Sequence, residues 1–512
     1  MSSTIQNYWF NEVVQDILKP EVNIVFIVDK SQILEFPQIK EKIQEDYPIL
    51  KQYKSEIELR LLLKKKVNKI IVIFKNEKEI PYDFLSKFVV FNIKHLFNDI
   101  FSKLDYEEVL KFPMEIYQIF YENYNKIKES LFEKMSKAET HNFLRNLIPD
   151  DYIQQRDYVI NIKSRIKNLT TEERKDFNWW GKVAENIGEL MYFLDNFNID
   201  DNITKLKSEL NDKFFNFIKE EYEDLIYDTG SHINSNLINL IFGGRKKKKA
   251  IICFDCMGFE EWYIIKDFLE SKNNLDFDVS YSFSILPSET KYSSSAIFAG
   301  MVPKSIKELD IINQIHWKNE AKLFKYNLTK NFNFKEDEIF FLRCLISDDL
   351  SISFDNLTDY NAVGFVFSFI DEISHSRRRI NKNKLLKTIK LDLEPSNLYE
   401  FFKSLIQQGF ETYIVSDHGS IFSKGNGINV SKELFDNRAR RYLLSNSEIL
   451  LKEYNEKINS SLLIQFRNLI GSDYLLLLSG DNMFGSKMKS GLTHGGISIE
   501  EVIVPFIKVV KK

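Results

Sequence analysis

Cysteine is scarce in this sequence. Only three cysteines, Cys253, Cys256 and Cys344, occur in 512 residues, and this small, odd number argues against a disulfide-stabilised fold. Cys253 and Cys256 form a C-x-x-C pair, but no second pair follows. Because Cys253 lies inside an apolar run, a buried thiol is favoured over a metal ligand. We therefore expect a protein of the reducing cytoplasm.

The sequence also lacks the features of exported and membrane proteins. No apolar run approaches the roughly 18 residues that a transmembrane helix needs. The chain starts Met-Ser-Ser-Thr-Ile-Gln-Asn, without the basic and apolar regions of a signal peptide. Internal repeats and low-complexity tracts are absent. We expect a cytoplasmic location and no membrane partner.

A strong positive charge is missing as well. The formal net charge is −4, so no global basic field indicates nucleic-acid binding. Three local basic clusters are present, at 64–66, 245–249 and 377–379. A solvated surface is the simpler explanation for each of them.

The composition is that of a large soluble protein. Apolar residues make up 44% and charged residues 28% of the chain, and 512 residues are enough for two or three domains. Apolar runs at 23–28, 70–74 and 88–92, separated by Lys- and Glu-rich helical stretches, predict a small α/β domain over 1–110 with a parallel sheet. Residues 111–244 show apolar residues at three- and four-residue spacing, which predicts a helical region.

Strand-like runs return in the last region, 245–512. They lie at 250–254, 362–368, 412–416, 474–478 and 502–506, with helical stretches such as 398–406 between them. This alternation predicts an α/β fold with an open, mostly parallel sheet and helices on both faces. Residues 301–355 interrupt the pattern and are a possible cap or insertion.

Metal-ligand residue types follow several of these runs. They are Asp255, Asp371, His375, Asp417, His418 and His494, to which Thr290 adds a hydroxyl. Ligands in open α/β sheets bind at the carboxyl ends of the strands, where bare carboxylates would repel one another. Two divalent cations supply +4, against −3 from the three aspartates and −1 from an ionised hydroxyl. The charges therefore balance for two metals beside an alcohol nucleophile, which indicates phosphoryl chemistry.

Each piece taken alone has a simpler explanation. A D-x-x-x-H pair on a helix is usually a surface pair, D-H-G after a strand also forms ordinary turns, and the spacing from Thr290 to Gly300 has little specificity. The order of the pieces, their places after strands and their use of three of the seven histidines argue against coincidence. The other four, His95, His141, His232 and His316, fit no such pattern and are expected to be ordinary surface or core residues.

The motifs resemble the PglZ domain family of the alkaline phosphatase superfamily. The resemblance rests on Leu-Pro-Ser-Glu-Thr at 286–290 running into Phe-Ala-Gly at 298–300, on Ser-Asp-His-Gly at 416–419, and on Thr-His-Gly-Gly-Ile-Ser-Ile-Glu-Glu-Val-Ile-Val-Pro at 493–505. It covers 245–512 and, more weakly, extends to the N-terminal region of PglZ proteins of bacterial phage-defence (BREX-type) systems. A basic residue expected near Met257 and Gly258 is absent.

The resemblance implies an alkaline-phosphatase-like catalytic domain with two divalent metal ions. Zinc is the default for such a ligand set, and manganese is the alternative. By the resemblance, Asp255, Thr290, Asp417 and His418 hold one ion. Asp371, His375 and His494 hold the other. Thr290 would be the nucleophile that attacks phosphorus.

The function that follows is a metal-dependent phosphodiesterase or nuclease of a defence system, acting on nucleic acid or a nucleotide. Two alternatives remain: a non-catalytic scaffold of a defence complex, and a phosphomonoesterase or phosphomutase with the same core. We expect residues 1–240 to bind another protein of the system, or DNA. Arg377, Arg378 and Arg379, close after His375, are candidates for substrate binding, together with the cluster at 245–249.

Overall fold

The structure is a computed structural model. It describes residues 14–15, 17–18, 22–29, 34, 37–64, 69–85, 89–92, 98–109, 111–112, 116, 119–120, 123–147, 150–171, 176–196, 203–228, 232–244, 247–272, 275–345, 357–376, 382–431, 434, 440–458, 461–465, 469 and 473–511. The chain divides into two compact units, Met1–Gln155 and Arg156–Lys512. The three-region division drawn from the sequence stays a prediction.

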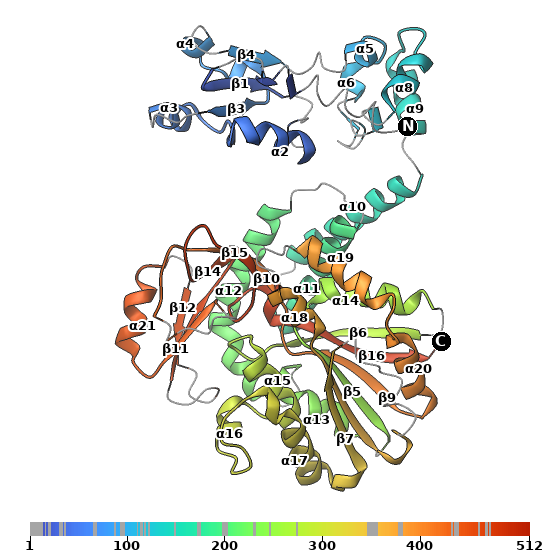
Figure 1. The fold of residues 1–512 in the computed structure, drawn as a ribbon, viewed down its shortest axis with the longest axis vertical. Coiled ribbons are helices and arrows are strands. Elements are labelled where there is room, and N and C mark those ends of the chain that lie inside the picture. The colour runs from blue at the N-terminus through green and yellow to red at the C-terminus, as the bar shows by residue number, and fades with distance from the viewer. Residues whose placement is uncertain are drawn as a thin grey trace. The chain divides into compact units, whose positions relative to one another are not determined.

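The N-terminal unit contains a four-stranded parallel sheet in the order β2-β3-β1-β4 (Figure 1). Its strands are β1 (Ile24–Val28), β2 (Ile49–Gln52), β3 (Ile70–Phe74) and β4 (Val89–Asn92). Its helices are α2 (Pro37–Asp46), α3 (Glu56–Lys64), α4 (Tyr82–Leu85), α5 (Asn98–Phe101), α6 (Tyr106–Val109), α8 (Tyr124–Ser130) and α9 (Lys137–Leu147), with the 3-10 turn η2 (Glu77–Glu79). β3 is buried along its whole length, because a parallel sheet is covered on both faces.

The C-terminal unit contains the candidate site. Its helices are α11 (Phe177–Asn196), α12 (Thr204–Tyr227), α13 (Leu237–Phe242), α14 (Phe259–Glu270), α15 (Thr290–Ala299), α16 (Pro303–Lys307), α17 (Glu320–Phe332), α18 (Phe369–Ser376), α19 (Lys382–Leu393), α20 (Leu398–Gln407), α21 (Glu448–Asn455) and α23 (Ile499–Val502); α10 (Asp150–Thr170) spans the division between the units. The 3-10 turns are η4 (Asn234–Asn236), η5 (Trp317–Asn319), η6 (Glu336–Glu338) and η7 (Leu357–Asp359).

Six strands form the central sheet of this unit. They are β5 (Lys249–Phe254), β6 (Leu275–Phe283), β7 (Ile339–Cys344), β8 (Ala362–Phe367), β9 (Glu411–Ser416) and β16 (Ile503–Lys511). The order is β6-β16-β9-β5-β8-β7; β7, β8, β5 and β9 are mutually parallel, and β16 is antiparallel to both of its neighbours. The mostly parallel sheet predicted from the sequence is confirmed. The edge strand β7 lies within the segment 301–355.

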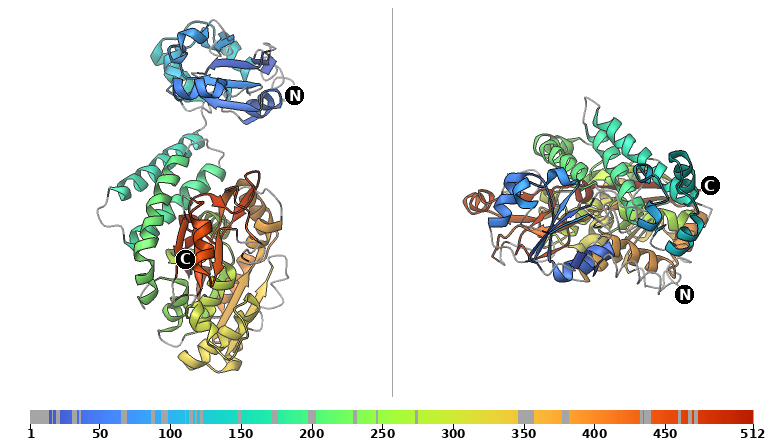
Figure 2. Two further views of the ribbon diagram at one scale, coloured as in Figure 1. Left: turned by 90° about the vertical axis from the view of Figure 1, so that its left-hand side faces the viewer. Right: turned by 90° about the horizontal axis from the view of Figure 1, so that it is seen from above.

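Helices cover both faces of this sheet, as the sequence predicted. Along β5, Ile252 and Phe254 join a core that includes Trp262 of α14, whereas Ile251 joins a second core with Phe298 of α15. Successive residues of a strand point to opposite faces, so the uninterrupted apolar run of β5 is buried on both sides. Figure 2 shows the helices and strands from two further directions.

Two smaller sheets lie between β9 and β16 in the sequence. One contains β10 (Ile421–Gly425), β14 (Asn482–Met483) and β15 (Ser490–Thr493); the other contains β11 (Tyr442–Ser445), β12 (Ser461–Ile464) and β13 (Tyr474–Leu478). The run 474–478, expected in the main sheet, is thus the middle strand of a separate antiparallel sheet. The pairing of Ile421 with Thr493 brings the segments beside His418 and His494 together.

The three cysteines are buried free thiols. Among the described residues, no helix combines the length and the apolar character needed to cross a bilayer.

Candidate active site and metal centre

Three neighbouring parallel strands bring three carboxylates to one edge of the central sheet. Phe254, the last residue of β5, pairs with Phe367 of β8 and Ser416 of β9, so these strands end at the same level. Asp255 and Asp417 follow β5 and β9 directly. Asp371 lies in the first turn of α18, the helix that follows β8.

Asp255, Asp417 and His418 form the first group of candidate metal ligands. Their potential ligand atoms lie within 4.8 Å of one another, and all three residues are buried. Oδ1 of Asp417 accepts the backbone N–H of His418 at 2.9 Å and that of Cys256 at 3.1 Å, which fixes the carboxylate. Nδ1 of His418 lies 3.0 Å from the carbonyl oxygen of Gly419. If Nδ1 donates to that carbonyl, the lone pair of Nε2 faces into the site.

Thr290 adjoins this group. Its hydroxyl donates to Oδ1 of Asp255 at 3.0 Å, and Nε2 of His418 lies 3.0 Å from Oγ1 of Thr290. Thr290 is the first residue of α15, a helix of 10 residues. Unpaired N–H groups and the positive end of a helix dipole favour a negatively charged group at this position.

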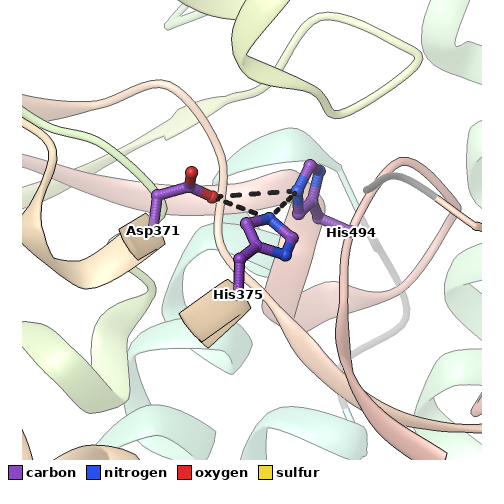
Figure 3. Close-up of side chains that lie close together, drawn as sticks. All are labelled: Asp371, His375 and His494. Carbon is purple, nitrogen blue, oxygen red and sulfur yellow. Dashed lines mark hydrogen bonds and ion pairs between the residues drawn. The ribbon is translucent and has the colours of Figure 1, made fainter. Parts of the chain in front are cut away.

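Asp371, His375 and His494 form the second group of candidate metal ligands (Figure 3). Asp371 and His375 are one turn apart on α18, and Nε2 of His375 lies 3.0 Å from Oδ1 of Asp371. Nε2 of His494 lies 3.1 Å from Nε2 of His375 and 3.9 Å from Oδ1 of Asp371. The three atoms converge on one point, as Figure 3 shows.

The two groups adjoin one another. The rings of His418 and His494 are stacked, with centroids 4.3 Å apart and an interplanar angle of 23°. The structure thus brings Thr290 and the six candidate metal ligands predicted from the sequence into one site. The arginines at 377–379 lie outside the described residues, and their role in substrate binding stays a prediction.

A buried ion pair fixes the loops that carry the two histidines. Arg441 and Glu501 are fully buried and bonded to each other at 2.9 Å. The backbone carbonyl of Glu501 accepts the N–H of Gly419, and its carboxylate accepts the N–H of Gly496, at 3.1 and 3.0 Å. A Cβ at Gly419 would lie 2.1 Å from a backbone oxygen, so the D-H-G motif requires glycine here.

Burial and mutual repulsion strongly perturb the ionisation of the site. Burial, reinforced by Asp255, raises the pKa of Asp417 to about 8. Burial and then Asp371 raise the pKa of Asp255. Burial opposes protonation of His418, but Asp417, Cys256 and Asp255 together outweigh it and raise the pKa of this imidazole well above its ordinary value. Burial and the neighbouring His418 hold the pKa of His494 well below its ordinary value.

The residues of this site fit divalent cations. Among the described side chains, Oδ1 of Asp371 and Oδ2 of Asp417 are buried without a hydrogen-bond partner, and each belongs to one of the two groups. Nε2 of His375 lies 3.0 Å from Oδ1 of Asp371, and Nε2 of His418 lies 3.7 Å from Oδ2 of Asp417. A buried carboxylate oxygen without a hydrogen bond is costly, and a cation held between oxygen and nitrogen would satisfy both. Two imidazole nitrogens that face each other at 3.1 Å are likewise suited to share an ion.

The sequence did not reveal three further residues of the site. Arg343 on β7 donates to Oδ2 of Asp255 at 3.0 Å and to both carboxylate oxygens of Glu320. His316, expected to be an ordinary residue, lines the same pocket of about 530 Å³ as Thr290. No spacing relates Arg343, Glu320 and His316 to the ligand motifs; an arginine within the apolar run of β7 was the only available signal.

Comparison with known proteins places the C-terminal unit in a family. Residues 235–509, more than half of the chain, match the family model described as BREX system PglZ alkaline phosphatase-like domain. No curated protein matches the chain.

Several solved structures show a distant likeness. Phosphonoacetate hydrolase from Sinorhizobium meliloti 1021, in complex with phosphonoacetate, is 10% identical, with 51% of this chain and 90% of that chain covered and a TM-score of 0.34. Murine ectonucleotide pyrophosphatase/phosphodiesterase 5 is 11% identical, with 51% and 88% covered and a TM-score of 0.33. The human counterpart is 10% identical, with 51% and 87% covered and a TM-score of 0.31.

Proposed function

The chain belongs to the family of BREX system PglZ alkaline phosphatase-like domains, and from this membership and the geometry of the site we propose that it is a metal-dependent phosphodiesterase. Its substrate would be nucleic acid or a nucleotide, and its setting a bacterial phage-defence system. The membership supports the broader statement, a hydrolase that acts on phosphoester bonds.

The position of Thr290 is the observation that carries the proposal. Its hydroxyl lies 3.0 Å from both Asp255 and His418, at the N-terminus of α15 and in the wall of an open pocket. An alcohol nucleophile needs a neighbouring group that takes its proton and an environment that accepts negative charge. Thr290 has both, whereas a hydroxyl with only a structural role has no need of either.

The two ligand groups would hold one divalent ion each, with zinc as the first choice and manganese as the second. When bound, such ions supply Lewis acidity that favours the ionised hydroxyl and neutralises charge on the phosphate oxygens. Asp255, Asp417 and His418, with Thr290, would hold the first ion. Asp371, His375 and His494 would hold the second.

The residues of the chain would do the remaining work. Oγ1 of Thr290 forms a bond to phosphorus while the ester oxygen leaves as an alcohol, and water then cleaves the phosphothreonine to release the phosphate product. The backbone N–H groups of Thr290 and Lys291, which begin α15, would face the phosphate oxygens that gain charge. Arg343 holds Asp255 in place beside the hydroxyl.

Two other functions compete with this one. A scaffold of a defence complex would retain the fold without turnover, and in that case the bonded hydroxyl of Thr290 would have no purpose. A phosphomonoesterase or phosphomutase would share the same core. Whether the protein is an enzyme or a scaffold, residues 1–240 would bind another protein of the system, or DNA.

Turnover of two generic substrates separates these functions. We expect the protein loaded with zinc or manganese to hydrolyse bis(p-nitrophenyl) phosphate with a higher kcat/KM than p-nitrophenyl phosphate. Thr290→Ala should abolish both reactions, and Thr290→Ser should retain part of the activity. A higher kcat/KM for the monoester would favour the phosphomonoesterase. No turnover of either ester with metal bound would favour the scaffold.

A further inference from the structure

Part of the pocket wall around Thr290 contains no candidate metal ligand. It is made by Gln314, Ile315, His316 and Trp317, with Lys291 and Arg343 beside them. These residues lie outside the two ligand groups, and the chemistry at Thr290 does not use their side chains directly, apart from the bond of Arg343 to Asp255. These side chains are therefore available to contact the part of a substrate that lies beyond the phosphoester group.

Trp317 is an exposed indole in this wall. Its exposed fraction is 40%, whereas Trp179, Trp180 and Trp262 are at most 3% exposed. The guanidinium carbon of Arg343 lies 5.3 Å from the centre of its ring, and Arg343 is itself anchored by Glu320. The ring is thus held by a fixed cation without being buried, and an exposed aromatic surface at a pocket is suited to bind a flat ligand.

Polar groups adjoin the indole. Nδ1 of His316 accepts the backbone N–H of Lys318 at 3.1 Å, so Nε2 carries the hydrogen and is a donor. Gln314 offers an amide, with both donor and acceptor atoms. Lys291 is exposed and lines the pocket, and its ammonium group lies 5.1 Å from the centre of the Tyr292 ring. Lys318, also exposed, places its ammonium group 5.5 Å from the indole centre.

We infer that this wall is a subsite for the nucleobase of a nucleoside phosphoester, with Trp317 as its stacking surface. A nucleobase presents a flat π face and an edge of hydrogen-bond donors and acceptors, which the indole and its polar neighbours match. A sugar phosphate lacks the flat face. The ring of a phosphotyrosine lacks the hydrogen-bonding edge. The lysines suit the phosphate groups on either side of a nucleoside.

This inference rests on the proposed function and narrows its substrate to a nucleotide with an unstacked base. A base that is paired and stacked inside a duplex cannot place its face on Trp317, because its own neighbours cover that face. The substrates that fit are single strands, strand ends and free nucleotides. Stacking on one aromatic side chain is a sequence-tolerant contact, since every base has a π face.

A pair of substrates with one leaving group tests the subsite. Thymidine 5′-(p-nitrophenyl phosphate) and methyl p-nitrophenyl phosphate both release p-nitrophenol, but only the first carries a base. We expect the wild-type protein to prefer the thymidine ester. Trp317→Ala should lower the ratio of the two kcat/KM values about tenfold, and Trp317→Phe should retain most of the ratio. Tyr82→Ala, which removes an aromatic ring that is 90% exposed in the N-terminal unit, is the matched control.

Binding of AMP and of ribose 5-phosphate to metal-loaded full-length protein, measured by calorimetry, gives a readout that needs no turnover. AMP should bind about tenfold more tightly, and Trp317→Ala should remove the difference. If neither ester reacts but this preference is present, the proposed function fails and the subsite stands. If both esters react with a ratio that Trp317→Ala leaves unchanged, the subsite is wrong and the proposed function stands. If neither ester reacts and AMP binds no more tightly than ribose 5-phosphate, both the proposed function and the subsite are wrong.

Discussion

Arg343 donates a hydrogen bond from Nη1 to Oδ2 of Asp255 over 3.0 Å, while the hydroxyl of Thr290 donates to Oδ1 of the same carboxylate. The edge strand β7 thereby fixes the carboxylate next to the candidate nucleophile. Glu320, only 1% exposed, anchors the other side of the guanidinium. One arginine therefore joins two buried carboxylates, and their orientation depends on it.

We predict that Arg343→Met destabilises the fold by about 3 kcal/mol, because it leaves Glu320 and Asp255 buried without their cation. Adding Glu320→Gln should recover part of this loss, since a neutral amide is cheaper to bury than an unpaired carboxylate. Urea unfolding of the single and double variants measures both effects. Lys452→Met removes an exposed pair with Glu448 and is the control, with an expected cost below about 1 kcal/mol. A double variant no more stable than Arg343→Met would contradict this account of the pair.

His375→Ala and His494→Ala should leave the fold intact but weaken the second metal position. Each removes one of three converging ligands, whereas the stability of the unit depends on its large apolar cores. We expect metal content to fall by about one ion per chain and phosphodiesterase activity to fall by orders of magnitude. His141→Ala, in the N-terminal unit, is the control. Wild-type rates in both variants would show that Asp371, His375 and His494 are no metal site.

Glu260 predicts a pH dependence of stability that does not involve the metal centre. Burial raises the pKa of this carboxyl from 4.5 to about 8, although Lys382 opposes the shift. Between these pH values the unfolded chain releases the proton and the folded chain retains it, so the free energy of unfolding falls as pH rises; above about 8 the effect levels off. Below about pH 4.5 the carboxyl is neutral in both the folded and the unfolded state, and its contribution to the free energy of unfolding is fully present.

Glu260→Gln should therefore reduce the loss of stability between pH 5 and pH 8 by about 3 kcal/mol. Urea unfolding at both pH values checks this. Glu400→Gln alters an exposed carboxylate on α20 and is the control. Identical pH dependence in the wild type and Glu260→Gln would show that Glu260 ionises normally in the folded protein.

Arg377, Arg378 and Arg379 remain candidates for guiding a phosphate backbone. Replacing all three with Gln should weaken cleavage of single-stranded DNA and flatten its salt dependence, because fewer counterions are released on binding. A small aryl diester should be nearly unaffected. The lysines at 64–66, replaced together, provide the comparison. Equal loss on both substrates would assign the arginines to the fold or the metal centre, and no loss would assign them to the solvated surface.

Much of the fold was predictable because its signals are local. An apolar run that ends in Asp255 or Asp417 identifies both a buried strand and a side chain at the sheet edge, so the amino-acid sequence is enough to locate the candidate ligand motifs. The run 474–478 is apolar like the strands of the main sheet, but it pairs antiparallel with its neighbours in another sheet. The composition of a strand does not specify which strand it pairs with.

Other parts of the site depend on long-range register. Arg343 reaches Asp255 only because β7 lies next to β8, and β8 next to β5. Trp317 and His316 reach the pocket through the short 3-10 turn η5 and the residue before it, which are too short to show a periodicity in the sequence. Neither relationship has a fixed spacing in the sequence, because both depend on how elements far apart in the chain are arranged in space.

The central claim is that Thr290 is a nucleophile beside two divalent ions. The most direct measurement is metal content by elemental analysis after reconstitution with zinc or manganese, taken together with phosphodiesterase activity, for the wild type and Thr290→Ala. We predict about two ions per chain in the wild type, and loss of activity by orders of magnitude in Thr290→Ala with at least the second ion retained. A protein that binds no metal, or a Thr290→Ala variant that keeps wild-type activity, would contradict the account.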